Sequence, residues 1–190
     1  MRGKEELLYD VINQLEEESR ELGIPSISRE DGTLLAGLAF ASCLDGDGLI
    51  VDAGAGMGYS TAWLILGTMG ARGRCKVVAI EYDSRLFKYL QRASQALSKF
   101  ANIEIINDNA LSALSRLQGI RVLFVDVEKH HYPEALRLGA PRVKSGGVLA
   151  FHNAFFPRPP DEFFDAVKEL GWPHIAVPTL AGGMLIIRKP

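Results

Sequence analysis

The sequence lacks a long apolar run, an excess of positive charge and a cysteine-rich framework. Its apolar stretches, such as Val122–Val125, are strand-sized and far below the ~20 residues that span a bilayer, so no membrane partner is expected. A formal net charge of -2 does not indicate the strongly basic surface of a nucleic-acid-binding protein. The two cysteines, Cys43 and Cys75, predict neither a disulfide framework nor a paired metal motif. Together with a charged N-terminal segment that resembles no secretory leader, they favour a reducing, cytoplasmic setting.

The 190 residues are 47% hydrophobic and 23% charged, which is typical of a folded globular chain. This length predicts a single domain spanning residues 1–190, without repeats or low-complexity segments. We expect residues 1–45 to form N-terminal helices that cover the sheet and the substrate side. Residues 46–190 would then form the cofactor-binding core.

Short apolar runs alternate with helical segments along most of the chain. After two N-terminal helices, the second over 31–43, strands are predicted at 49–51, 76–80, 103–106, 122–125 and 147–151, with helices at 61–68, 84–100, 111–117, 132–143 and 161–170. The runs at 175–177 and 184–187 are too close for a crossover helix and must pair antiparallel. The pattern predicts an α/β, Rossmann-like, doubly wound fold. Its seven-stranded sheet is mainly parallel, with one antiparallel strand near the C-terminal edge and helices on both faces.

The segment V-D-A-G-A-G-M-G-Y-S over 51–60 is the main chemical signal. Gly54, Gly56 and Gly58 permit a tight turn and close backbone approach to a ligand, and the helix that follows presents its N-terminus to an anion. A dinucleotide fingerprint would place its third glycine where Tyr59 stands. A nicotinamide-dependent oxidoreductase therefore stays an alternative that Tyr59 opposes.

Two further polar positions follow the next predicted strands. Glu81 ends the second parallel strand, where an acid can accept both hydroxyls of a ribose. Asp108 and Asn109 follow the third strand, where a polar side chain can meet an adenine amine, although such residues are also ordinary helix caps.

At this point the chain resembles the class I S-adenosylmethionine-dependent methyltransferases. More narrowly, it resembles the metal-dependent O-methyltransferases of the catechol and caffeoyl-CoA type. The resemblance covers nearly the whole chain. It rests on the glycine segment and on I-P-S-I-S-R-E-D-G (24–32), F-V-D-V-E-K-H-H-Y (124–132), G-G-V-L-A-F-H-N (146–153) and the ending around 180–189.

The resemblance implies that S-adenosylmethionine is the cofactor. Ser60 and neighbouring amides would take its carboxylate, Glu81 its ribose, and Asn109 and Ala110 its adenine. The full set of implied cofactor-binding residues is Asp52, Gly54, Gly56, Gly58, Tyr59, Ser60, Glu81, Tyr82, Asn109, Ala110 and Asp126.

The resemblance also implies a divalent metal held by Asp126, His152 and Asn153. The middle position is a histidine where the family has an aspartate. Imidazole favours Mn²⁺, Fe²⁺, Co²⁺ or Zn²⁺ over Mg²⁺. The hypothesis is either a changed metal preference or a weakened or absent metal site.

Lys129 falls on the lysine that the family uses as general base toward the acceptor hydroxyl. Phe155 and Phe156 fall where the related enzymes stack an aromatic side chain on a planar acceptor. The expected activity is O-methyl transfer to a small, catechol-like molecule, with a tRNA hydroxyl or a non-catalytic cofactor-binding module as alternatives. A homodimer is a further expectation, since relatives often dimerise.

Overall fold

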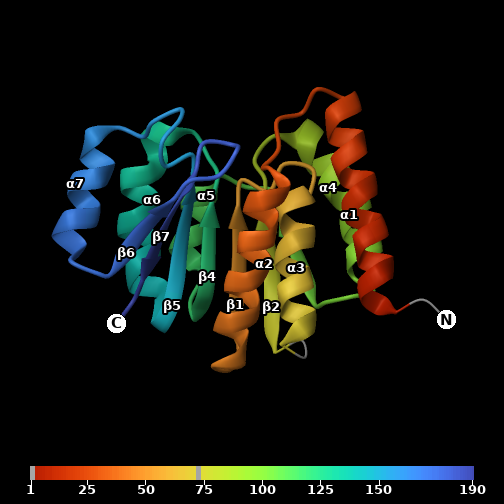
Figure 1. Cartoon of the computed structure of the whole chain (residues 1–190), viewed down its shortest axis with the longest axis horizontal. Coiled ribbons are helices and arrows are strands. Elements are labelled where there is room, and N and C mark those ends of the chain that lie inside the picture. The colour runs from red at the N-terminus through yellow and green to blue at the C-terminus, as the bar shows by residue number, and fades with distance from the viewer. Residues whose placement is uncertain (1–2, 72–73) are drawn as a thin grey trace.

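The computed structural model describes residues 3–71 and 74–190 and shows one twisted sheet between two layers of helices (Figure 1). The helices are α1 (Lys4–Glu21), α2 (Arg29–Leu44), α3 (Tyr59–Gly70), α4 (Ser84–Leu97), α5 (Ala110–Arg116), α6 (Tyr132–Gly139) and α7 (Asp161–Leu170). The strands are β1 (Gly48–Ala53), β2 (Cys75–Ile80), β3 (Ile103–Ile106), β4 (Ile120–Val125), β5 (Val143–His152), β6 (His174–Val177) and β7 (Met184–Arg188).

The strand order is β3-β2-β1-β4-β5-β7-β6. Strands β1 to β5 pair in parallel, whereas β7 runs antiparallel to both of its neighbours, β5 and β6. The order reverses between β1 and β4, because the chain winds outward from β1 to one edge and then returns to build the other half. The predicted doubly wound sheet with a single reversed strand next to the C-terminal edge is confirmed.

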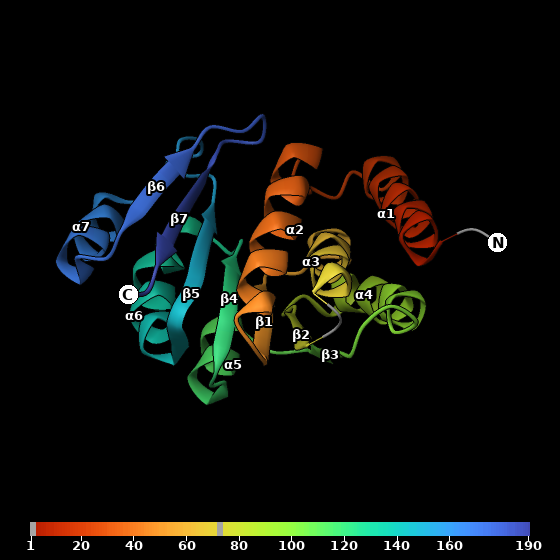
Figure 2. The same cartoon turned by 60° about the horizontal axis from the view of Figure 1, so that its bottom comes forward.

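The sheet carries a separate apolar core on each face. Alternate residues of a strand point to opposite faces, so Ile50 and Phe124 pack under α1 to α4, while Val51 and Val125 pack under α5, α6 and α7. The turned view in Figure 2 shows these two helical layers on either side of the strands. Burial on both faces explains why the strands read as continuous apolar runs.

Most element boundaries lie within a few residues of the prediction. Helix α2 begins earlier than expected because Ser28 caps it, accepting a hydrogen bond from the Asp31 amide at 3.2 Å while the Asp31 carboxylate accepts from the Ser28 amide at 3.0 Å. The helix predicted over 132–143 ends at Gly139 and continues only as a short 3-10 turn containing Pro141. Phe40 on α2 is 42% exposed.

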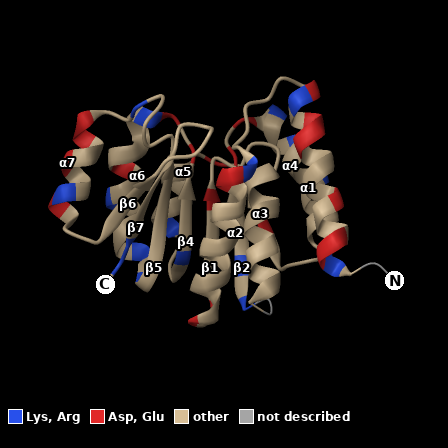
Figure 3. Cartoon of the chain, in the orientation of Figure 1, with Lys and Arg blue, Asp and Glu red and all other residues tan. Residues whose placement is uncertain are grey.

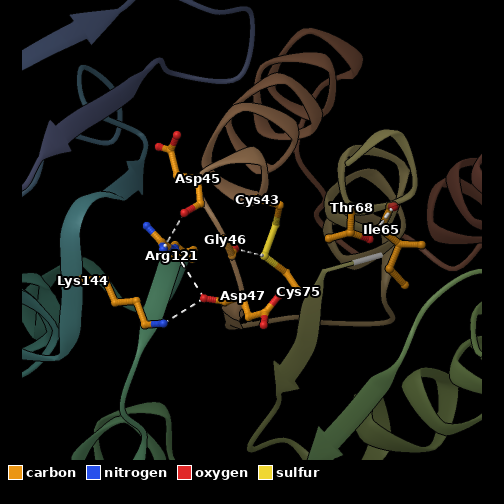
Figure 4. Close-up of a disulfide and its surroundings, with 9 residues drawn as sticks. All are labelled: Cys43, Asp45, Gly46, Asp47, Ile65, Thr68, Cys75, Arg121 and Lys144. Carbon is orange, nitrogen blue, oxygen red and sulfur yellow. Dashed lines mark hydrogen bonds between the residues drawn. A yellow bond between two sulfur atoms is a disulfide. The ribbon is translucent and has the colours of Figure 1, made fainter. Parts of the chain in front are cut away.

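The prediction that the cysteines form no disulfide is wrong. Cys43 at the end of α2 and Cys75 at the start of β2 are joined by a disulfide, with their Cα atoms 5.9 Å apart (Figure 4). Both side chains are buried. The pairing arises because β2 lies beside β1, the strand that follows α2, a spatial relationship that a separation of 32 residues conceals.

The carboxyl ends of the parallel strands all open at one edge of the sheet. Figure 3 shows acidic residues gathered there, around the upper tips of the central strands. In an open α/β sheet this edge, at the point where the strand order reverses, is where ligands bind. None of the helices in the described part of the chain combines the length and apolar character of a membrane-crossing segment.

Candidate functional site

The glycine-rich loop lies between β1 and α3, at the reversal of strand order. Gly54 has φ +96°, and a Cβ there would stand 2.1 Å from the carbonyl oxygen of Asp126. Its amide donates to the Ile80 carbonyl at 3.0 Å, so the loop is tied to β2 and pressed against the end of β4. Only glycine fits this crossing of three chain segments. The loop is thereby held in one position, and Gly54 lines a cavity on each side of it.

Asp52 is fully buried just before this loop. Its Oδ2 accepts hydrogen bonds from the hydroxyls of Ser60 (2.8 Å) and Thr61 (2.6 Å), whereas its Oδ1 has no partner. Burial raises the pKa of Asp52 to about 6, although the two hydroxyls oppose that shift. An unpartnered buried carboxylate oxygen is costly, and a cationic ligand group nearby would relieve that cost.

Glu81 at the end of β2 shapes the loop in this structure. Its Oε2 accepts from the Gly56 amide and its Oε1 from the Asp83 amide, both at 2.8 Å. Burial raises the pKa of Glu81, and these backbone bonds work against the rise. The side chain stands beside the loop as predicted, but a ribose would have to share its oxygens with these amides.

The first cavity lies beyond the ends of β1, β2 and β4. Five of its lining residues were singled out from the sequence: Gly54, Tyr82, Asp108, Asn109 and Ala110. Asn109 also caps α5, accepting from the Leu111 amide at 2.9 Å, so it serves both as a cap and as part of the wall. Tyr82 donates to Glu128 Oε1 at 3.0 Å, and this hydrogen bond joins two lining residues across the cavity.

The second cavity lies on the other side of the glycine loop and shares Gly54 with the first as a lining residue. Of the predicted residues it is lined by Gly54, Gly56, Tyr59, Ser60 and Asp126. The N-terminus of α3 faces it, with Gly58 as a cap that has no side chain to offer. This end of the helix therefore presents backbone donors and positive dipole to the cavity.

Asp126 lines this cavity, and Lys129 is hydrogen-bonded to it. Lys129 Nζ donates to Asp126 Oδ1 (3.1 Å), Tyr132 Oη (2.8 Å) and, more weakly, the Val127 carbonyl (3.4 Å). Burial alone would raise the pKa of Asp126, but His152 and Lys129 outweigh burial and lower it. The predicted base, Lys129, and the predicted cofactor and metal ligand, Asp126, are therefore in direct contact.

His152, at the end of β5, lies between two carboxylates. Its Nε2 is hydrogen-bonded to Asp31 Oδ2 at 3.4 Å, and its Nδ1 lies 3.2 Å from Asp126 Oδ2, at ion-pair distance but off the line of a hydrogen bond. Burial would lower the pKa of His152, yet the two carboxylates raise it to about 9. Burial likewise acts to raise the pKa of Asp31, but hydrogen bonds from His152, Ser28 and Thr179 lower it to about 2.

Asn153 does not face this cluster. Its Nδ2 donates to the carbonyls of Ala181 (2.8 Å) and Phe156 (3.1 Å), so the side chain ties the loop after β5 to the loop before β7. Within residues 3–71 and 74–190, no group of three or more His, Cys, Asp or Glu side chains is arranged to hold a metal ion.

Phe155 and Phe156 lie on the same loop and are 51% and 77% exposed. Phe155 packs against Gly183, where a Cβ would come within 2.3 Å of its ring. Neither phenylalanine lines the two cavities. Their placement gives an exposed apolar rim near the cluster, next to Leu180.

Several residues of the site were not predicted individually. Asp31 and Thr179 join the His152 cluster, and Pro25–Ile27 line the second cavity. Asp31 and Pro25–Ile27 belong to the segment 24–32 that the resemblance to the O-methyltransferases includes, which was the available signal. His131, directly before α6, lines the first cavity, and its ring centroid lies 3.9 Å from that of His130.

Comparison with known proteins connects this geometry to one family. The family model for a methyltransferase domain matches residues 51–154, which run from the second half of β1 to just past the end of β5. A Mycobacterium tuberculosis protein named as a probable O-methyltransferase is 27% identical over 144 residues, which are 73% of this chain and 60% of that protein. The chain spans less than two thirds of the length of the curated mycobacterial relatives that it matches.

Solved structures share the fold at low sequence identity. A methyltransferase from Geobacter sulfurreducens superposes with a TM-score of 0.77 at 21% identity, covering 95% of this chain and 89% of that one. An O-methyltransferase from Bacillus cereus, solved in complex with S-adenosylhomocysteine, superposes with a TM-score of 0.69 at 16% identity, covering 95% and 91%. At these low sequence identities, the similarity shows a shared fold and no more.

Proposed function

This chain belongs to the methyltransferase domain family, and from that premise we propose that it is an S-adenosylmethionine-dependent O-methyltransferase. The observation that carries the proposal is the glycine loop at the reversal of strand order, with one cavity on each side of it. The two cavities differ in chemistry as the two halves of S-adenosylmethionine differ. A folded pocket of this kind is the default ligand site of an open α/β sheet.

The first cavity suits the adenosine half. Its walls combine apolar side chains, Ile80 and Leu111, with the polar edge of Asp108 and Asn109. An adenine ring can lie against the former while its amine meets the latter. Glu81 stands beside the loop where a ribose would follow, provided that its oxygens accept from the ribose as well as from the backbone.

The second cavity suits the methionine half. The N-terminus of α3 can hold the cofactor's carboxylate. Asp126, which lines this cavity, and the buried Asp52, whose Oδ2 accepts from the lining residue Ser60, would supply negative charge for the ammonium and sulfonium groups. A dinucleotide offers no such pair of cations, so the charge pattern favours S-adenosylmethionine over NAD.

In the proposed reaction the acceptor's oxygen attacks the methyl carbon in line with the sulfur. The O–C bond forms as the C–S bond breaks, and S-adenosylhomocysteine leaves with the sulfur's electron pair. Lys129 is proposed to take the hydroxyl proton, since its Nζ donates to Asp126, a lining residue of the second cavity. The three acceptors around Nζ match an ammonium group, so one of these contacts must be given up when the lysine acts as a base.

The acceptor is proposed to be a small molecule with a planar apolar part. Phe155, Phe156 and Leu180 supply an exposed apolar rim close to the loop that Asn153 ties down. Single exposed apolar residues are common, but three on two adjoining loops beside the candidate site fit an aromatic acceptor. The predicted divalent metal forms no part of this proposal, because its implied ligands engage other partners.

The test is transfer of label from methyl-labelled S-adenosylmethionine to a panel of catechols and simple phenols, with unmodified tRNA as a separate arm. The proposal expects an O-methyl ether on a small phenolic acceptor and equimolar S-adenosylhomocysteine. Label on tRNA alone would refute the small-molecule acceptor. Failure to bind the cofactor at all would refute the activity.

A further inference from the structure

Resting on the proposed function, we propose that the imidazole of His152 bridges Asp31 and Asp126 and stands in place of the divalent cation that the resemblance implies beside Asp126. The site then holds an organic donor in place of a metal, and methyl transfer proceeds without a metal ion. His152 acts here as a positioning residue, since it is buried and its nitrogens face carboxylates and not the cavities. Both carboxylates beside His152 already have partners of their own.

The oxygens of Asp126 are already engaged. Oδ1 accepts from Lys129 Nζ at 3.1 Å, and Oδ2 lies 3.2 Å from the His152 ring. A metal ion bound to Asp126 would have to approach these oxygens to about 2.0–2.6 Å, where the ammonium group and the ring stand close by. It would therefore have to displace either the ammonium group or the ring.

The opposite side of the ring is fixed by Asp31, which is fully buried. Asp31 Oδ2 also accepts from the Ser28 hydroxyl at 2.6 Å, and Oδ1 from the Thr179 hydroxyl at 2.5 Å. With its carboxylate held on both oxygens, Asp31 anchors Nε2 and sets the plane of the imidazole. Asp31 and His152 thus form one unit that reaches from the start of α2 to the end of β5.

Asn153 is fixed by its amide nitrogen. Its Nδ2 donates to two carbonyls of the neighbouring loops, and a Cβ on Gly182 would come within 2.9 Å of that nitrogen. The amide is thus packed into the loop pair on which Phe155 lies, and it cannot turn toward Asp126 as a whole without breaking this contact.

The test converts the bridge back to a carboxylate. In H152D the ring is removed and an oxygen donor replaces it, so the variant should gain saturable Mn²⁺ binding, followed by electron paramagnetic resonance of free Mn²⁺. H174D, which makes the same change at an exposed histidine on β6, is the matched control. We expect the affinity of H152D for Mn²⁺ to exceed that of wild type and H174D by roughly tenfold or more. A folded H152D that takes up no more Mn²⁺ than H174D would overturn the inference.

A second measurement needs no altered cluster. Wild-type protein, with and without S-adenosylhomocysteine, is expected to show no saturable Mn²⁺ uptake and no change in melting temperature on adding Mn²⁺ or Mg²⁺. Uptake of one Mn²⁺ per chain that D126N abolishes would overturn the inference, whether or not H152D folds. S-Adenosylhomocysteine binding is scored separately, so that failure of the proposed function is distinguishable from failure of the metal-free bridge.

Discussion

Asp31 and His152 are 121 positions apart in the sequence, yet the carboxylate of one and the imidazole of the other are hydrogen-bonded at 3.4 Å inside the protein. Asp31 lies in the first turn of α2 and His152 closes β5, so the contact joins the N-terminal helices to the half of the sheet beyond the reversal of strand order. Through His152 the pair also contacts Asp126, which lines the second cavity. The contribution of this pair to stability can be measured directly.

The first prediction concerns stability against pH. The pKa of His152 is raised to about 9 in the folded protein, above its ordinary 6.5. Its contribution to stability is therefore complete below about pH 6.5 and is lost as the pH rises through 9. The free energy of unfolding, from urea denaturation, should fall over this window in wild type and much less in H152Q. Equal slopes in the two proteins would contradict the pairing.

Asp31, the carboxylate of the same pair, changes the stability in the opposite direction with pH. The pKa of Asp31 is lowered to about 2 from 3.8, so its contribution is present above about pH 4 and is lost as the pH falls through 2. Asp52 titrates between these windows, with its pKa raised to about 6, and its burial penalty grows as the pH rises from 3.8 through 6. Because Asp52 is still titrating just above pH 6, the upper part of the window, toward pH 9, isolates His152 from both acids.

The second prediction concerns the glycine loop. Gly56 has φ +56° and open space within 4 Å of the position that a Cβ would occupy, so asparagine, which tolerates this conformation, should fold and fill the second cavity. We expect G56N to weaken S-adenosylhomocysteine binding by about tenfold or more in calorimetry. G171N is the matched control, because Gly171 has φ +66°, equally open surroundings and no place in either cavity. Equal weakening in both variants would show that the effect comes from the backbone.

The third prediction separates two roles for Lys129. If the lysine takes the acceptor's proton, K129A and K129R should both lose roughly 10²–10⁴-fold in the rate of methyl transfer, because arginine keeps its proton. Cofactor affinity should change little in either variant. A K129R enzyme that retains most of the rate would contradict the base role and leave Lys129 as a source of positive charge beside Asp126.

The fourth prediction concerns the disulfide. Joining Cys43 to Cys75 closes a loop that contains β1, the glycine loop and α3, so the bond restricts the unfolded chain. Reductant should lower the free energy of unfolding by about 2–4 kcal/mol. The C43A/C75A variant should be insensitive to reductant, and a wild-type protein equally insensitive would show that the bond does not form in solution.

The sequence was sufficient to predict the sheet because its signals are local. Continuous apolar runs, a short link between 177 and 184, and glycines directly after a strand each have one simple structural explanation. The contact of Asp126 with Lys129 is equally local, at a separation of three residues. The element order and the glycine loop therefore followed from pattern alone.

The cluster around His152 and the disulfide could not be predicted in this way. Both depend on which helix end packs beside which strand end in the folded protein. The residues near Asp31 and Cys43 in the sequence do not indicate their partners, which lie 121 and 32 positions away. The use of Asn153 as a loop tie was hidden for the same reason, since Ala181 approaches it only after β7 returns beside β5. Residue identity gave the candidates, and tertiary packing decided their partners.

Isothermal titration of wild-type protein with S-adenosylhomocysteine tests the central claim most directly. The two cavities around Gly54 predict saturable binding at one ligand per chain, unchanged by chelator, with no comparable heat from NAD. A well-folded protein that gives no binding heat with S-adenosylhomocysteine or S-adenosylmethionine would contradict the account.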